Sequence, residues 1–293
     1  MRHFEQKVSS YGKSASKETP VAVTIAGSDN SGGAGIQADL KTFTHFEVYA
    51  QTVITCVVAE VPGKVCSIQA IEPEVIRDQL NLSLNYFPVR AIKTGMLYSR
   101  EIIALVCNAF EAFPQDQRPF LVVDPVMVAA SGHPLVQSDA IEQYRSRLFP
   151  LANLITPNLD EAAAILATKL ETLRQMRAAA TELYKKFRVP FLLKGGHLKS
   201  AEAVDLLIDG DGTHQFSEPY QYGVQTHGTG CAYSAAIAAN VALGLTRKEA
   251  VGVAKKYITH AIRDSFHWKT RAGEVSALRH FWSKRPASPR KVE

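Results

Sequence analysis

The order of apolar and amphipathic segments is the feature that most constrains how this chain can fold. From residue 21 onward, short apolar runs alternate with longer segments whose apolar residues recur with helical spacing. This alternation is typical of parallel strands joined by crossover helices, which cover both faces of the sheet. The sequence therefore predicts an α/β fold with a central, mostly parallel sheet between two layers of helices.

The expected elements follow one another without an internal repeat or a Pro/Gly-rich linker. We assign a polar N-terminal tail to residues 1–20, one domain to residues 21–265 and a basic C-terminal tail to residues 266–293. Strands are expected at residues 21–26, 52–59, 91–94, 120–124, 154–156, 191–194 and 203–208. Helices are expected near residues 35–46, 74–86, 99–109, 138–147, 158–167, 171–187, 231–243 and 246–265.

The formal net charge of +5 is concentrated at the two ends of the 293-residue chain. Residues 263–293 hold eight basic and three acidic side chains, residues 1–20 hold four and two, and the intervening body carries −2. No basic stripe interleaved with aromatic residues supports contact with nucleic acid, so we interpret the basic end as a solvated terminus. The charge of the whole chain therefore says little about its ligand.

Cysteine spacing and hydropathy exclude several classes of protein. The four cysteines are widely scattered, without a CxxC pair or a Cys/His cluster, which predicts neither a disulfide framework nor a structural zinc site. No apolar run approaches the roughly 20 residues of a membrane-spanning helix. Residues 1–20 lack the apolar core of a signal peptide. We expect a cytoplasmic protein.

A glycine-rich loop, AGSDNSGGAG at residues 26–35, joins the first expected strand to the first expected helix. Glycines let backbone N–H groups approach a ligand closely, and the free N–H groups of a helix start favour anions. Ligands of open parallel sheets bind outside the carboxyl ends of the strands, which is where this loop lies. The loop is therefore a candidate anion site.

A second loop, THGTGC at residues 226–231, leads into another expected helix. Gly228, Thr229 and Gly230 offer consecutive backbone amides that can form a hole for a negatively charged oxygen. Cys231 follows them at the helix N-terminus, where the helix dipole is expected to lower the pKa of its thiol. We interpret Cys231 as a reactive residue rather than as buried packing.

Polar side chains also follow the other expected strands. Asp124 ends the strand FLVVD, while Asn158 and Glu161 lie just beyond the next strand, at a helix start. Two carboxylates and an amide suit Mg²⁺ held mostly through water. For Asn158 and Glu161 the alternative is a helix capping box. Lys194 ends the strand FLLK and is expected to face a phosphate.

These groups together favour phosphoryl transfer, which needs an anion hole, cations, a metal and an acceptor for the hydroxyl proton. No GxxxxGK[ST] phosphate loop occurs in the chain. Acyl transfer is an alternative that would use Cys231 with His227 or His197, but the sequence shows no acid partner for either histidine.

A Rossmann-type NAD-dependent oxidoreductase is a remote alternative. Residues 33–38 fit the pattern G-x-G-x-x-G/A, and Glu60 follows at a distance suited to a ribose-binding acid. The glycines of that pattern begin almost where the strand ends, whereas here six residues separate Ala26 from Gly33.

Six motifs carry a resemblance that runs from about Val21 to Ile262. They are TIAGSDNSGGAGIQADLKTF, KTGML, VVDPVMVAASG, ITPNLDEAAAIL, LLKGGH and THGTGCAYSAAIAA. In this order they resemble the motifs of hydroxymethylpyrimidine and phosphomethylpyrimidine kinases, members of the ribokinase-like superfamily that act in thiamine biosynthesis. The resemblance implies a three-layer α/β sandwich, ATP with Mg²⁺ as the phosphoryl donor, and frequently a homodimer. The implied partner is a small pyrimidine alcohol or its monophosphate, with neither nucleic acid nor membrane.

The resemblance also implies a role for each matching residue. Cys231 stands where other ribokinase-like enzymes place an aspartate base, behind the anion hole of Gly228, Thr229 and Gly230. The other implied positions are Asp124, Asn158 and Glu161 for Mg²⁺ and its waters; Lys194, Thr226 and Lys255 for ATP or phosphate; and Ala34, Asp39, Glu60, Met96 and Val126 for the pyrimidine.

Three departures from the family pattern concern the choice of substrate. The family usually has Gln where this chain has Glu60, and an ionised carboxylate accepts hydrogen bonds but cannot donate them. The family's lysine in AKSG is Ala130 here, and its C-terminal GPVNHF appears only as GEVSALRHFW. We therefore expect weak phosphorylation of the free alcohol. Pyridoxal kinase activity and a non-catalytic ligand-binding protein remain alternatives.

Overall fold

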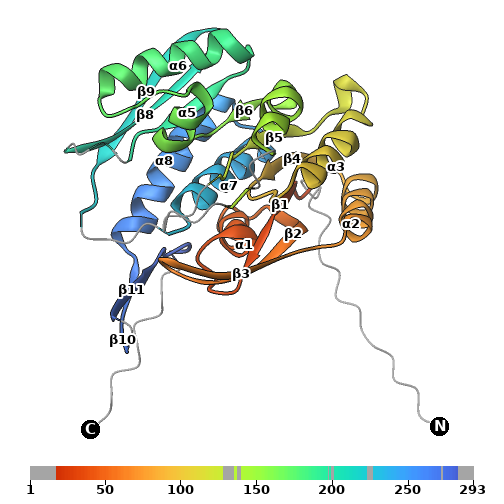
Figure 1. The fold of residues 1–293 in the computed structure, drawn as a ribbon, viewed down its shortest axis with the longest axis horizontal. Helices are drawn as coiled ribbons and strands as arrows, with labels where there is room; N and C mark the ends of the chain where they lie inside the picture. Colours follow the sequence, from red (N-terminus) through yellow and green to blue (C-terminus); the bar gives the residue numbers. More distant parts are fainter. Residues whose placement is uncertain are drawn as a thin grey trace, which may run out of the picture.

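The computed structural model describes residues 18–127, 135–136, 140–196, 198, 201–222, 227–271 and 273–282. Within these residues, one nine-stranded sheet has the strand order β3-β2-β1-β4-β5-β6-β7-β8-β9. Helices lie on both sides of this sheet (Figure 1). The strands are β1 (Val21–Asp29), β2 (Tyr49–Val61), β3 (Lys64–Ala70), β4 (Val89–Thr94), β5 (Phe120–Val123), β6 (Leu154–Ile155), β7 (Phe191–Lys194), β8 (Glu202–Asp209) and β9 (Gly212–Pro219).

Alternate residues of the strands pack against opposite helical layers. In β5, Leu121 and Val123 face a core built with α2, α3, α5 and α6, whereas Val122 faces a core built with α1, α7 and α8. Because both faces are buried, the central strands are almost entirely apolar. The helices are α1 (Gly35–His45), α2 (Pro73–Tyr86), α3 (Arg100–Glu111), α4 (Ala140–Gln143), α5 (Leu159–Leu166), α6 (Leu173–Phe187), α7 (Thr229–Ala242) and α8 (Arg247–Arg263).

The predicted fold class is confirmed, because every expected strand and helix is present and β2, β1, β4, β5, β6 and β7 pair in parallel. Strands β3, β8 and β9 add antiparallel pairs at the two edges. The sequence pattern misses β3 and β9, which are edge strands of half-exposed, largely polar residues. No helix in the described ranges is long and apolar enough to cross a bilayer.

The parallel register brings polar residues to one edge of the sheet. The N–H of Asp124 donates to the carbonyl of Thr94 at the end of β4, and the N–H of Thr156 donates to Val123. Asn158 forms an isolated parallel bridge with Lys194. The residues that follow β5, β6 and β7 therefore lie side by side, as the rule for ligand sites in open sheets requires.

The predicted C-terminal tail begins at residue 266, yet the chain continues there as packed structure. Strands β10 (Phe266–Thr270) and β11 (Gly273–Ala277) form an antiparallel hairpin outside the main sheet (Figure 1). Leu278, which follows it, is buried in the core that contains α1, α7 and α8, and Trp282 packs against that core. Each strand has only five residues, mostly exposed, so the alternation of Phe266 and Trp268 in β10 is too short to predict a hairpin from the sequence.

His280 fixes the segment after the hairpin to the helical layer. Its side chain is buried, and its Nδ1 lies 3.2 Å from the hydroxyl of Tyr257 and 3.4 Å from that of Thr42. Burial lowers the pKa of His280 to about 4, with smaller effects of Lys41 and His45 in the same direction. The imidazole is therefore neutral in the folded protein near pH 7.

Acid is expected to destabilise the fold through His280. The unfolded chain binds a proton at this residue with a pKa of about 6.5, whereas the folded chain does so only near 4. The stabilisation is complete above pH 6.5 and is lost as the pH falls towards 4, by about 3 kcal/mol. Urea unfolding at pH 7 and pH 4 should show this loss in the wild type and in His267→Gln, an exposed control, but not in His280→Gln. An equal loss in His280→Gln would contradict the assignment.

Candidate active site

The first glycine-rich loop is held in shape by the carboxylate of Asp29, the last residue of β1. Its oxygens accept hydrogen bonds from the N–H groups of Ser31, Gly33 and Ala34 at 2.6, 3.1 and 2.7 Å. Burial raises the pKa of this carboxyl group, but hydrogen bonds, above all from His227, outweigh burial and lower the pKa to about 2. Asp29 is therefore a fixed anion, and our sequence analysis did not single it out.

The two glycine-rich loops touch each other through their backbones. Gly228 caps α7 with a φ of +79°, and a Cβ atom added to it would overlap the carbonyl oxygen of Gly33. A Cβ added to Gly33 would lie 2.8 Å from the imidazole ring of His227. The N–H of Gly35, at the start of α1, donates to the sulfur of Cys231. The N-termini of α1 and α7 thus form one surface.

The thiol of Cys231 does not have the lowered pKa that we expected from its helix position. Burial raises its pKa; Lys93 opposes this, and the carboxylates of Asp39 and Asp124 reinforce it, so that the pKa lies at about 11. Desolvation and two nearby anions outweigh the dipole of one helix turn. The expectation of an acidic thiol is therefore wrong: the thiol holds its proton at neutral pH.

Thr229 and Gly230 form the first turn of α7, so this helix begins two residues earlier than expected. The first N–H groups of a helix have no partner within the helix and can bind an anion. A Cβ added to Gly230 would lie 3.2 Å from Nζ of Lys194 and 3.6 Å from Oδ2 of Asp124. The candidate anion hole therefore lies directly beside the charged residues at the ends of β5 and β7.

Asp124 is buried at the centre of a polar network. Its Oδ1 accepts from Nζ of Lys194 at 2.7 Å and from the hydroxyl of Thr156 at 3.1 Å, and its Oδ2 accepts from Ser234 at 3.1 Å. Burial raises the pKa of Asp124, but the ammonium groups of Lys194 and Lys93 reverse this and lower it. Lys194, expected to face a phosphate, thus has a carboxylate as its partner here.

Asn158 and Glu161 form the capping box that was the alternative to a metal site. The side chain of Asn158 accepts from the N–H of Glu161, and the carboxylate of Glu161 accepts from the N–H of Asn158, each at 2.8 Å. Burial raises the pKa of Glu161 to about 8, because the charge of Asp124 works with burial and that of Lys194 only partly opposes it. The carboxyl groups of Asp124 and Glu161 lie close together, and the site offers only oxygen donors. This combination fits a hard divalent cation such as Mg²⁺.

Lys255 was also expected at the nucleotide or phosphate. Its side chain is buried in α8, and its Nζ donates to Oδ2 of Asp205 at 2.7 Å. The other oxygen of Asp205 accepts from the N–H of Gly195, just after β7. Lys255 is therefore part of a buried ion pair that joins α8 to β8 and to the loop after Lys194.

Asp39 was expected at the substrate, but its side chain is fully buried beneath the first loop. Its Oδ2 accepts from Nζ of Lys93 at 2.8 Å and from the hydroxyl of Thr24, while its Oδ1 has no partner among the described residues. Lys93 belongs to the motif KTGML and is also fully buried. We assigned no role to Lys93 from the sequence, although a lysine directly after the apolar pair Ala91 and Ile92 in a central strand was a signal.

A third apolar cluster is separate from the two main cores. It contains Cys56 and Met96, with Val126 packed against them. Ala34 is the N-cap of α1, and Glu60 lies half-buried near the end of β2. Ala34, Glu60, Met96 and Val126 are four of the five residues that we expected to hold the pyrimidine, and they come from four segments of the chain.

His227 has an acid partner that the sequence did not reveal. Its Nε2 lies 3.3 Å from Oδ2 of Asp29, and side-chain ligand atoms of Asp29, Glu60 and His227 all lie within 4.8 Å of one another.

Three residues of the sequence analysis, Thr226, His197 and Ala130, lie outside the described residues.

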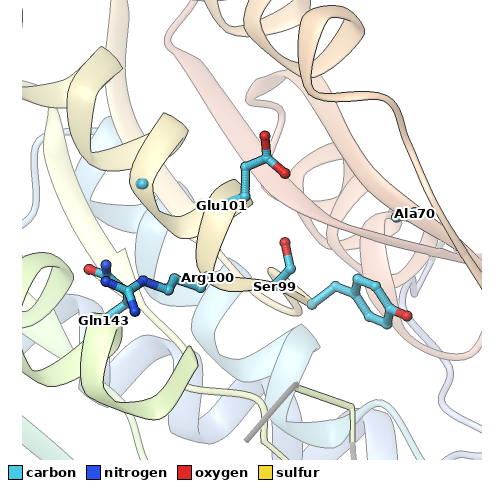
Figure 2. Close-up of a pocket in the computed structure, with 7 residues that line it drawn as sticks. Ala70, Ser99, Arg100, Glu101 and Gln143 are labelled. Carbon is cyan, nitrogen blue, oxygen red and sulfur yellow. The ribbon is translucent and has the colours of Figure 1, made fainter. Parts of the chain in front are cut away.

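A surface pocket of about 540 Å³ lies beside the start of α3. Its lining residues include Ser99, Arg100 and Glu101 at the start of α3, Gln143 of α4 and Ala70 at the end of β3 (Figure 2). None of the predicted site residues lines this pocket, so it is distinct from the edge where the two glycine loops meet.

The sequence matches the model of the phosphomethylpyrimidine kinase family over residues 29–276. The chain belongs to this family. It is 41% identical to the hydroxymethylpyrimidine/phosphomethylpyrimidine kinase of Rhizobium meliloti, over 83% of this chain and 91% of that protein. It is 40% identical to the pyridoxine kinase of Bacillus subtilis, over 88% of this chain and 96% of that protein.

Solved structures of relatives share the fold. The pyridoxal kinase of Staphylococcus aureus in complex with AMP-PCP and pyridoxal has a TM-score of 0.81 and 33% identity, covering 92% of this chain and 96% of that one. Other relatives are longer: this chain spans about half the length of the bifunctional thiamine biosynthesis proteins of Geobacter sulfurreducens and Arabidopsis thaliana, at 49% and 53%.

Replacing Gly228 by Ala should destabilise the protein more than the same change at Gly244. Both glycines have positive φ, at +79° and +96°, which costs an alanine about 1 kcal/mol. Only at Gly228 would the new methyl group meet backbone, that of Gly33, whereas nothing lies within 4 Å at Gly244. Overlap adds about 1–3 kcal/mol. Chemical unfolding of both variants tests this. Equal losses in the free energy of unfolding would show that the contact between Gly228 and Gly33 leaves room for a methyl group.

Proposed function

We propose that this protein is a kinase that transfers the γ-phosphoryl group of ATP to 4-amino-5-hydroxymethyl-2-methylpyrimidine phosphate and to the free alcohol. The observation that carries the proposal is the junction of the two glycine loops beside Asp124 and Lys194. It combines free backbone N–H groups, buried charges and an apolar cluster at one edge of the sheet, as phosphoryl transfer to an aromatic alcohol requires.

The chain's own residues supply positioning and charge. The N–H groups of Gly228, Thr229 and Gly230 stabilise the transferring phosphoryl group, which gains charge on its oxygens as it moves. Lys194 reaches this group from its pair with Asp124. Lys255, through Asp205, holds the loop after β7 in place and lies behind the nucleotide rather than against it.

Asp124, Asn158 and Glu161 would hold Mg²⁺, mostly through water. The fit rests on their oxygen donors and on the closeness of two carboxyl groups, since the charge of Asp124 adds to burial in raising the pKa of Glu161. When bound, Mg²⁺ would neutralise charge on the phosphates.

Pyridoxal kinase activity is a second candidate, because relatives named pyridoxine kinase and pyridoxal kinase match most of this chain. Pyridoxal is also a flat aromatic alcohol that would fit beside Cys56 and Met96. A pyrimidine is favoured by the acidic group at Glu60, which suits an exocyclic amine that pyridoxal lacks.

We further propose that the protein is a homodimer and that it is located in the cytoplasm. The four free cysteines support the cytoplasmic location.

A substrate panel tests the proposed function directly. Purified protein with ATP and Mg²⁺ should phosphorylate the pyrimidine monophosphate and the free pyrimidine alcohol, with a kcat/KM for pyridoxal at least about tenfold lower. From the sequence we expected weak phosphorylation of the free alcohol, because Glu60 would carry an isolated negative charge. In the structure His227 lies within 4.8 Å of Glu60, so the charge of Glu60 is not isolated and we expect the free alcohol to be a substrate. Turnover of pyridoxal alone would contradict the proposal, and no turnover of any of the three would favour a binding protein.

Cys231→Ala should lower kcat at least 100-fold while changing the KM for ATP less than about threefold, because we assign the thiolate as acceptor of the substrate's hydroxyl proton. Since the pKa of the thiol is about 11, the thiolate is a minor form at neutral pH. Its population, and with it kcat, should rise as the pH is raised from 7 to 9. Steady-state kinetics at several pH values checks both. If kcat of the wild type did not change with pH and Cys231→Ala kept near-normal turnover, the acceptor of the hydroxyl proton would instead be a phosphoryl oxygen.

A further inference from the structure

Three titratable side chains from separate segments meet at the substrate side of the site. Asp29 ends β1, Glu60 lies near the end of β2 and His227 precedes α7. Ligand atoms of the three side chains lie within 4.8 Å of one another, and His227 Nε2 lies 3.3 Å from Asp29 Oδ2. We refer to them as the Asp29–Glu60–His227 cluster.

Asp29 acts in this cluster as a permanent negative charge. Its two oxygens already accept hydrogen bonds from Ser31, Gly33 and Ala34, in addition to the contact with His227. These bonds favour the ionised form of the carboxyl group. Any proton that the cluster gains or loses is therefore held by Glu60 or by His227.

Glu60 and His227 depend on each other for their charge. Burial and the charge of Asp29 raise the pKa of Glu60, while His227 lowers it. Burial lowers the pKa of His227, but Asp29 and Glu60 outweigh it and raise that pKa. The thiol of Cys56, whose pKa burial raises to about 11, stays neutral beside them. Two groups that interact in this way titrate as a pair.

We propose that Glu60 and His227 share one proton, and that this proton lets Glu60 recognise an aminopyrimidine as an amide would. With the proton, the carboxyl group of Glu60 donates to a ring nitrogen and accepts from the exocyclic amine; without it, Glu60 can only accept. If His227 holds the proton before binding, the proton moves to Glu60 as the substrate binds, and the protein exchanges no proton with water. His227 is thus a positioning residue that acts through Glu60. The inference rests on the proposed function.

Binding of the aminopyrimidine should depend on pH through this shared proton. Once the shared proton is lost at higher pH, binding requires a proton from water and weakens by about tenfold per pH unit. His227 gives the proton a second place to reside, so its removal should move this loss to lower pH. In Glu60→Gln the amide carries its own N–H, so binding should no longer depend on the cluster's proton.

Calorimetric titration with 4-amino-5-hydroxymethyl-2-methylpyrimidine, without ATP, tests the proposal between pH 6 and pH 9. His227→Gln should begin to lose affinity about one pH unit below the wild type. Glu60→Gln should show a flat profile, and adding His227→Gln to it should leave that profile flat. His214→Gln, the same substitution on β9, should match the wild type. Titrations at pH 8.5 in two buffers of different ionisation enthalpy should detect proton uptake in the wild type but not in Glu60→Gln.

Two results would overturn the inference alone: superimposable pH profiles for wild type and His227→Gln, or a wild-type pH dependence that persists in Glu60→Gln. Should His227→Gln fail to fold, absence of proton uptake in the wild type at pH 8.5 would also overturn it. A wild type that binds pyridoxal but not the pyrimidine at any pH would instead overturn the proposed function, and the inference with it.

Discussion

The backbone contact between the two glycine loops is the constraint on which the rest of the site depends. Gly228 fits against the carbonyl of Gly33 only because it lacks a side chain, and this contact sets the distance between the N-termini of α1 and α7. From that distance follow the hydrogen bond from Gly35 to Cys231 and the approach of His227 to the first loop. A larger residue at the contact would separate the groups that phosphoryl transfer brings together.

Positive charge in the site is held almost entirely in buried pairs. Three lysines of the site region each donate to an aspartate at 2.7 or 2.8 Å: Lys93 to Asp39, Lys194 to Asp124 and Lys255 to Asp205. Such pairs gain little net stability, since desolvation offsets their attraction, but they fix geometry. In a chain whose body carries −2, the attraction for phosphate that the proposed function requires would come from local groups, chiefly the backbone N–H groups at the start of α7.

The substrate side follows a different physical rule, because there the question is which ring is recognised. An apolar cluster around Cys56 and Met96 suits any flat heteroaromatic alcohol, which agrees with the presence of both pyrimidine and pyridoxal kinases among the relatives. Discrimination between such rings comes from hydrogen-bonding groups at their edge, where an unmatched partner is costly. Glu60 and its neighbour His227 are the groups placed to supply it.

The sequence by itself determined the alternation of the main strands and helices, the two loops and the resemblance to the family, because these depend on spacing along the chain. It also offered the capping box of Asn158 and Glu161 as an alternative to a metal site. It could have revealed β9 as well, since Asp-Gly pairs between residues 209 and 212 are typical of a tight hairpin. Only the tertiary structure decided which carboxylate pairs with each lysine, that Asp29 lies beside His227, and that the thiol of Cys231 has a raised pKa. Burial and charges from distant segments set these properties, and no local pattern records them.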